Sequence, residues 1–239
     1  MKMSIKQVAR IGGVFYLLII VAGLMGEFFV RAKLIVSGDA AATTNNIESS
    51  SLLWRFGIAG DLFMHVCDIP LVLIFYILLK PVSKNLALLA MLFVLTQTAV
   101  LIASKLILFM PLFLASDVGY LKVFAPDQLH ALSYLAIRLD AYGFGVGLIF
   151  FGFSCLILGH LISRSGYLPK LIGILMQIAG ACYLVNSVTL ILAPAIADIL
   201  FPVILLPSFI GELSFCLWLL VKGVDVSKWH EKTHALAHL

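Results

Sequence analysis

Three side chains that could do chemistry lie along one stretch of an otherwise apolar segment. Asp61, His65 and Asp68 are separated by four and then three residues. A helix turns by about 100° per residue, so these side chains would fall within about 60° of one another on one face. Two carboxylates and an imidazole in that arrangement can bind a divalent metal ion, relay a proton or pair with basic side chains. The stripe therefore predicts a polar site.

Other apolar segments carry further ionisable residues that could join this stripe. A charge at the bilayer centre costs about 2.5–3.5 kcal/mol on insertion scales, so such residues are expected to face protein or a cavity rather than lipid. We therefore predict a binding site for a small ligand, a proton or a cation. The residues assigned to this site are Asp61, His65, Asp68, Lys105, Arg138, Asp140 and Glu212.

The charges within the apolar segments do not balance. The acids there are Glu27, Asp61, Asp68, Asp140 and Glu212, and the bases are Arg55, Lys105 and Arg138. Five acids less three bases leave an excess of two negative charges when His65 is neutral. Because burying an unpaired carboxylate is costly, this excess predicts a bound proton or cation. We expect it at Asp68 and Glu212, which would form the floor of the site.

The composition defines the class of molecule that must position these side chains. Of the 239 residues, 62% are hydrophobic and 12% are charged, and the mean hydropathy is +1.12. A soluble domain would carry about 25% charged residues. This excludes a soluble enzyme and a nucleic-acid-binding domain, and it makes the lipid bilayer the main partner.

Six segments are long and apolar enough to cross a membrane as helices, because a span needs about 20 such residues. We predict an all-α, polytopic membrane protein built as a bundle of six transmembrane helices. A cytoplasmic N-terminus (1–10) and a cytoplasmic tail (223–239) would flank a transmembrane domain at 11–222. The expected helices cover 11–30, 52–79, 85–115, 128–161, 168–193 and 195–221.

Lysines and arginines between these segments are distributed unequally, and they accumulate on the cytoplasmic side of membrane proteins. With the N-terminus inside, three would lie outside: Arg31, Lys33 and Lys122. Ten would lie inside: Lys2, Lys6, Arg10, Lys80, Lys84, Arg164, Lys170, Lys222, Lys228 and Lys232. Both termini are therefore expected in the cytoplasm. With this topology the candidate residues concentrate in the outer half of the membrane, which predicts a pocket that opens outward.

Several kinds of site have little support in the sequence. The four cysteines fall within apolar segments without metal-type spacing, so no metal site is assigned. His65, His130 and His160 would lie at three different depths, which disfavours a bis-histidine haem. The glycine-rich stretch at 143–147 follows no strand, and it is typical of close helix packing rather than of dinucleotide binding. The cofactor therefore stays undetermined.

Two stretches of the chain resemble a known family. The first is Ala9–Leu17, and the second runs from Gly143 to Asn186 and includes Phe150–Phe153 and Arg164–Pro169. They are similar to the bacterial multi-pass membrane proteins catalogued as domain of unknown function 4386. The resemblance extends from Ala9 to about Gly223. It implies a location in the bacterial plasma membrane, and it brings no activity, substrate or catalytic residue.

Three functions remain open from the sequence. The first is binding or transport of a small ligand, proton or cation in the outward-facing pocket. The second is a non-catalytic membrane scaffold or partner protein, in which the buried charges are structural ion pairs. The third is a metal-dependent intramembrane enzyme, which would need several ligands to converge on one point. No catalytic residue is assigned.

Overall fold

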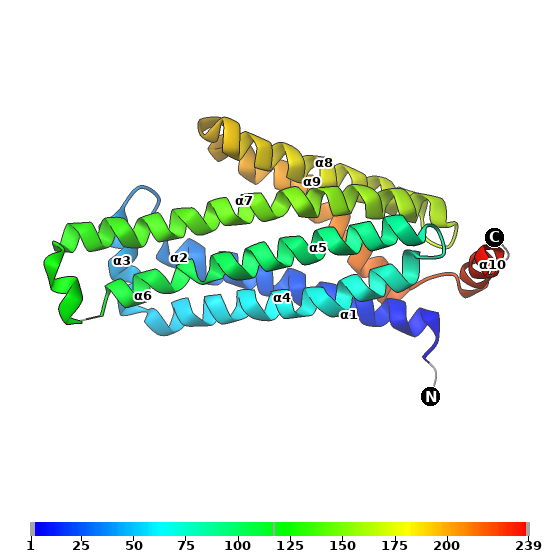
Figure 1. Cartoon of the computed structure of the whole chain (residues 1–239), viewed down its shortest axis with the longest axis horizontal. Helices are drawn as coiled ribbons and strands as arrows, with labels where there is room; N and C mark the ends of the chain where they lie inside the picture. Colours follow the sequence, from blue (N-terminus) through cyan, green and yellow to red (C-terminus); the bar gives the residue numbers. More distant parts are fainter. Residues whose placement is uncertain (1–2, 117, 238–239) are drawn as a thin grey trace. The chain divides into compact units, whose positions relative to one another are not determined.

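The structure is a computed structural model that describes residues 3–116 and 118–237, and within these residues it contains helices and no strand (Figure 1). Lys2, which was counted among the inner bases, and the ends of both predicted terminal segments (1–2 and 238–239) lie outside the described residues. Six of the helical stretches are long and apolar enough to cross a membrane. The expected all-α, polytopic membrane protein with six transmembrane helices is thereby confirmed.

The spans follow the hydrophobic pattern of the chain, and short helices occupy the connections between them. The six candidate spans are Ile5–Leu34, Ser51–Leu79, Lys84–Leu114, Pro126–Ser165, Lys170–Leu192 and Val203–Val221. The elements that form or flank them are α1 (Ile5–Met25), η1 (Gly26–Arg31), α2 (Ala32–Leu34), α3 (Ala40–Ser49), α4 (Ser51–Leu79), α5 (Lys84–Lys105), η2 (Ile107–Phe109), α6 (Met110–Leu114), η3 (Gly119–Val123), α7 (Pro126–Ser165), α8 (Lys170–Leu192), α9 (Pro194–Val221) and α10 (Val226–Ala237).

The chain forms two compact units, and four long helices contribute a segment to each. The α8–α9 unit comprises Met1–Ile19, Cys67–Thr98 and Gly145–Leu239. The α3–α6 unit comprises Ile20–Val66 and Ala99–Phe144. Helices α1, α4, α5 and α7 are therefore divided between the units, which are described one at a time below.

Within the α8–α9 unit, close helix packing depends on glycine. Helices α8 and α9 lie side by side (Figure 1). A Cβ atom on Gly173 of α8 would lie 2.5 Å from the carbonyl oxygen of Gly159 in α7. No side chain fits at that separation, and small residues are what allow membrane helices to approach so closely.

One end of the α8–α9 unit is fastened by hydrogen bonds to main-chain carbonyl groups. The Tyr167 hydroxyl and the Trp229 indole both donate to the carbonyl oxygen of Leu78, at 2.7 and 3.1 Å. The guanidinium of Arg10, in α1, donates to the carbonyl of Val221 at the end of α9, at 3.2 Å. The first turns of α1 and the last turn of α9 therefore lie at the same end of this unit.

Helix α10 begins with a side-chain cap at this end. The Asp225 carboxylate accepts a hydrogen bond from the Ser227 hydroxyl at 2.6 Å and one from the backbone N–H of Lys228 at 3.2 Å. These two bonds hold the pKa of Asp225 below its usual value. A carboxylate at this position also interacts favourably with the positive end of the helix dipole.

The α3–α6 unit has its own apolar core and its own capped helix. The Trp54 indole is buried and donates to the carbonyl of Leu108 at 2.8 Å. The Asp39 side chain accepts from the backbone N–H of Ala42, which caps α3. The core residues are Val30, Leu34, Ile47, Trp54, Ile58, Leu108, Leu112 and Ile137. The connection between the first two spans is therefore folded: it contains helix α3 and contributes Ile47 to this core.

Candidate functional site

The seven residues predicted to form one site are distributed over both units. Asp68 and Glu212 belong to the α8–α9 unit, and the other five belong to the α3–α6 unit. Each group has its own partners.

Four charged side chains of the α3–α6 unit form a connected network, called here the four-charge network. Lys105 Nζ donates to both carboxylate oxygens of Asp140, at 2.8 and 2.9 Å. The same ammonium lies 3.6 Å from Asp61 Oδ2, and Asp61 in turn accepts a hydrogen bond from Arg31. Ser104 Oγ adds a bond of 2.9 Å to Asp140.

The four-charge network is electrically neutral, and three of its four members are buried, whereas the Arg31 side chain is 22% exposed. Asp61, Lys105 and Asp140 are 3%, 5% and 6% exposed, respectively. Two carboxylates face one guanidinium and one ammonium, so the formal charges sum to zero. A buried charge is tolerated when it is paired and hydrogen-bonded. The network therefore needs no additional ion to balance it.

The sequence reasoning missed Arg31, which had been counted as an outer-loop base. The chain continues through Gly26–Arg31 as a π-helix, which places Arg31 in the unit beside Asp61. Gly26 leaves the necessary room, because a Cβ atom there would lie 3.0 Å from Arg31 Nη1 and 3.3 Å from Asp61 Oδ1. The i, i+4 spacing of Glu27 and Arg31 was a signal that the helix continues, and these side chains lie 4.0 Å apart.

Two other predicted residues of this unit differ in their surroundings. His65 lies one turn after Asp61 in α4 and is 1% exposed, so it is a core side chain. Arg138, by contrast, is exposed and takes no part in the four-charge network. Asp61 and His65 of the predicted stripe are thus buried, and the arginine that pairs with Asp61 is Arg31 instead of the predicted Arg138.

The α8–α9 unit holds a different arrangement, called here the tyrosine–glutamate site. The Tyr16 hydroxyl donates to Glu212 Oε2 at 3.1 Å, and the Tyr183 hydroxyl donates to the other carboxylate oxygen. Among the described residues, the groups that act on Glu212 are these two tyrosines and Asp68, and none of the three is basic. A carboxyl group from α9 is thus held between hydroxyl groups from α1 and α8.

Aromatic rings surround one side of this site. The ring of Tyr16 is in edge-to-face contact with those of Phe75 and Phe215, at centroid distances of 5.7 and 6.2 Å. Tyr16 is 3% exposed and Phe215 is fully buried. The two tyrosines were not among the predicted site residues, although both lie in the stretches that carry the family resemblance.

Asp68 lies in the same unit as Glu212. The Thr98 hydroxyl donates to Asp68 Oδ2 at 3.2 Å, and the charges of Asp68 and Glu212 act on one another. The two acids that were expected to form the floor of the site therefore share a unit and an electrostatic interaction.

Residues 3–116 and 118–237 contain no cluster of side chains suited to bind a metal ion. No three His, Cys, Asp or Glu side chains in these ranges are grouped so that they could hold a metal ion. The cysteines Cys67, Cys155, Cys182 and Cys216 are free thiols. The side chains that have been described thus offer ion pairing and proton binding as their chemistry.

Comparison with known proteins yields one relative and one family. An uncharacterized protein of Archaeoglobus fulgidus is 28% identical over 173 residues, which cover 72% of this chain and 87% of the relative. No solved structure matches the chain. The family described as "Domain of unknown function (DUF4386)" matches residues 11–223. The chain, with its six apolar helices, is therefore a member of the DUF4386 family of multi-pass membrane proteins.

Proposed function

We propose that the protein binds a proton or a small cation at Glu212, as a step in moving that ion or a coupled ligand. The observation that supports this is the pairing of Glu212 with two hydroxyl groups and no base. Glu212 is half-buried and lies in a candidate membrane span, and a carboxylate kept from water without a cationic partner is costly. A bound proton or cation removes that cost, and the two tyrosine hydroxyls are suited to orient the carboxyl group.

The contrast between the two clusters supports assigning the function to Glu212. Asp61 and Asp140 already have Arg31 and Lys105 as partners, and their charges cancel. We assign them a structural role, in which the ion pairs fix how the helices of that unit pack. The proton or cation that the excess negative charge of the sequence predicts is then expected at the tyrosine–glutamate site.

The location and orientation are part of the proposal. We infer a bacterial plasma membrane, with both termini in the cytoplasm and access to Glu212 from the outer side. The ten-to-three distribution of basic residues supports this orientation. The hydrogen bond from Arg10 to Val221 also supports it, because it keeps the beginning of α1 and the end of α9 together.

Infrared difference spectroscopy of the protein in liposomes tests the proposal. At neutral pH the wild type is expected to show the C=O stretch of a protonated carboxyl group, and Glu212→Gln is expected to lose it. Glu27→Gln is the matched control, because Glu27 has a side chain that is 60% exposed. The control variant should keep the band.

Cation addition distinguishes the two ions. If a cation competes with the proton at Glu212, added sodium or potassium abolishes the band in the wild type and changes nothing in Glu212→Gln. The proposal is wrong if the two variants have the same carboxyl spectrum and the same response to cations. The structural scaffold, which the neutral four-charge network favours, would then be the better description of the protein.

A further inference from the structure

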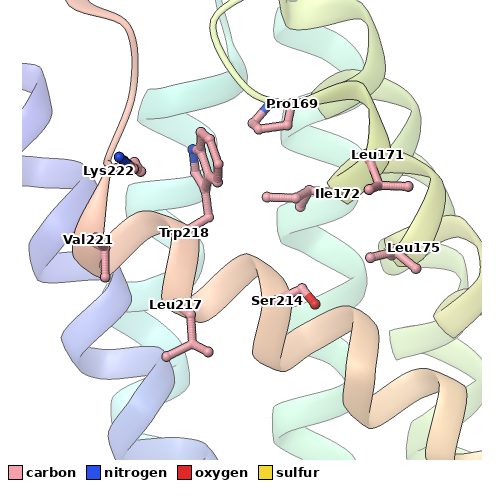
Figure 2. A pocket seen from close by; sticks show the side chains of 9 residues that line it. All are labelled: Pro169, Leu171, Ile172, Leu175, Ser214, Leu217, Trp218, Val221 and Lys222. Carbon is pink, nitrogen blue, oxygen red and sulfur yellow. The ribbon is translucent and has the colours of Figure 1, made fainter.

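A groove lies between α8 and α9 in the α8–α9 unit, and its lining includes none of Tyr16, Tyr183 and Glu212. It has a volume of about 430 Å³, within the range of about 300–1,000 Å³ that is usual for small-molecule sites. Figure 2 shows its two walls. Leu171 and Leu175 of α8 form one wall, and Leu217 and Trp218 of α9 form the other.

The lining of the groove is apolar except for two residues of α9 and its C-terminal end. Ser214 and Lys222 are the polar residues among those that line it. Lys222 is exposed and follows the last turn of α9. Lys170, also exposed, lies between the lining residues Pro169 and Leu171 at the start of α8. The groove therefore combines an apolar channel with one lysine in its lining, Lys222, and a second lysine, Lys170, that is adjacent in sequence to two lining residues.

We propose that this groove binds an anionic phospholipid. An acyl chain would lie between α8 and α9, against Leu175 and Leu217, and the headgroup phosphate would lie at Lys222 and Lys170. The indole of Trp218 is suited to the boundary between the acyl chain and the headgroup, because Trp is enriched where the hydrocarbon layer meets the headgroups. The bilayer that surrounds the chain supplies the ligand.

Charge complementarity is the reason for choosing an anionic lipid. Basic residues near a membrane surface attract acidic headgroups with about 1 kcal/mol for each Lys or Arg. The unit's end also carries Lys6 and Arg10, because α1 begins beside the end of α9. A zwitterionic lipid would fill the apolar channel equally well but would gain little from these lysines.

The experiment is thermal unfolding of the full-length protein in detergent micelles, titrated with either phosphatidylglycerol or phosphatidylcholine of the same chain length. The wild type is expected to gain more stability from phosphatidylglycerol. Lys222→Gln should weaken the apparent affinity for phosphatidylglycerol about five-fold, and it should leave the phosphatidylcholine response unchanged. Lys80→Gln is the matched control, because Lys80 is exposed in the same unit and does not line the groove. It should bind as the wild type does.

A second variant tests the channel. Ser214→Phe should fill the groove and reduce the response to both lipids, which native mass spectrometry would record as fewer co-purified lipids. If Ser214→Phe does not fold, the comparison of Lys222→Gln with Lys80→Gln still tests whether the groove binds phosphatidylglycerol. Equal stabilisation of the wild type by both lipids would overturn the proposal. So would a concentration-dependent dimer that Ser214→Phe abolishes, because a second copy of the chain would then be the occupant.

Discussion

At the scale of single residues, carboxyl groups on the apolar helices have two kinds of partner. Asp140 accepts hydrogen bonds from an ammonium group and a hydroxyl group, both buried. Within residues 3–116 and 118–237, Glu212 accepts hydrogen bonds from two tyrosine hydroxyls. The first arrangement compensates charge within the protein, and the second leaves the carboxyl group to a proton or cation from outside. The partner, rather than the carboxyl group itself, therefore determines the role we assign.

Removal of Lys105 tests the structural role of the four-charge network. Lys105→Met would leave Asp140 buried without its cation, and we expect a loss of about 3–5 kcal/mol in the free energy of unfolding. Reversible unfolding in mixed detergent micelles would measure it. Arg138→Gln is the control, because Arg138 is exposed and should change stability by less than about 0.5 kcal/mol.

A double variant separates the ion pair from other effects of the substitution. Lys105→Met combined with Asp140→Leu removes both charges, so most of the lost stability should return. If the double variant is as unstable as Lys105→Met alone, packing of the lysine stem rather than charge pairing would explain the loss.

At the scale of the elements, close approach between helices matters more than their individual hydrophobicity. Gly173 of α8 and Gly159 of α7 bring two backbones together where neither helix could carry a side chain. Gly60 of α4 is different, because a Cβ atom there would meet nothing within 4 Å. The same substitution should therefore have opposite effects at the two positions.

Alanine scanning of the two glycines tests this argument. Gly173→Ala should destabilise the protein by about 1–3 kcal/mol, because the backbones must separate. Gly60→Ala should stabilise it by about 0.4–1 kcal/mol, because the unfolded chain loses freedom and the folded helix has room. Thermal unfolding of both variants in one detergent would measure the difference. Equal effects at the two sites would show that the α7–α8 approach can relax.

At the scale of the whole molecule, the class of fold follows from hydropathy alone. Six apolar stretches separated by polar segments predict six helices, because the bilayer requires satisfied backbone groups. The candidate residues could also be identified, since charged side chains within such stretches are rare.

The partners within the site were harder to predict from sequence. Arg31 is the last residue of a π-helical segment, and the wider turn there moves Arg31 away from the position that regular α-helix geometry gives. Tyr16 and Tyr183 carry no formal charge, so a selection of charged residues within the apolar segments does not include them. Contacts between helices far apart in the chain depend on side-chain packing that a single sequence does not display.

Cysteine labelling of intact cells tests the proposed orientation of the whole molecule. Three native thiols, Cys67, Cys155 and Cys216, are buried, whereas Cys182 is half-buried, so the labelling is done in a Cys182→Ala background. A cysteine introduced at Ser227, which is exposed in the first turn of α10, should react with a membrane-impermeant maleimide only after the cells are opened. A cysteine at the exposed Ser37, after the first span, should react in intact cells. The reverse pattern would place the termini outside.

The neutrality of the four-charge network has a consequence for how the protein responds to voltage. Charges that sum to zero experience no net force from the electric field of an energised membrane. An ion that reaches Glu212 from one side is a net charge, and carrying one elementary charge through a full drop of 100 mV involves about 2.3 kcal/mol. Occupancy of Glu212 should therefore follow the electrical state of the cell, while the Arg31–Asp61–Lys105–Asp140 pairs stay indifferent to it.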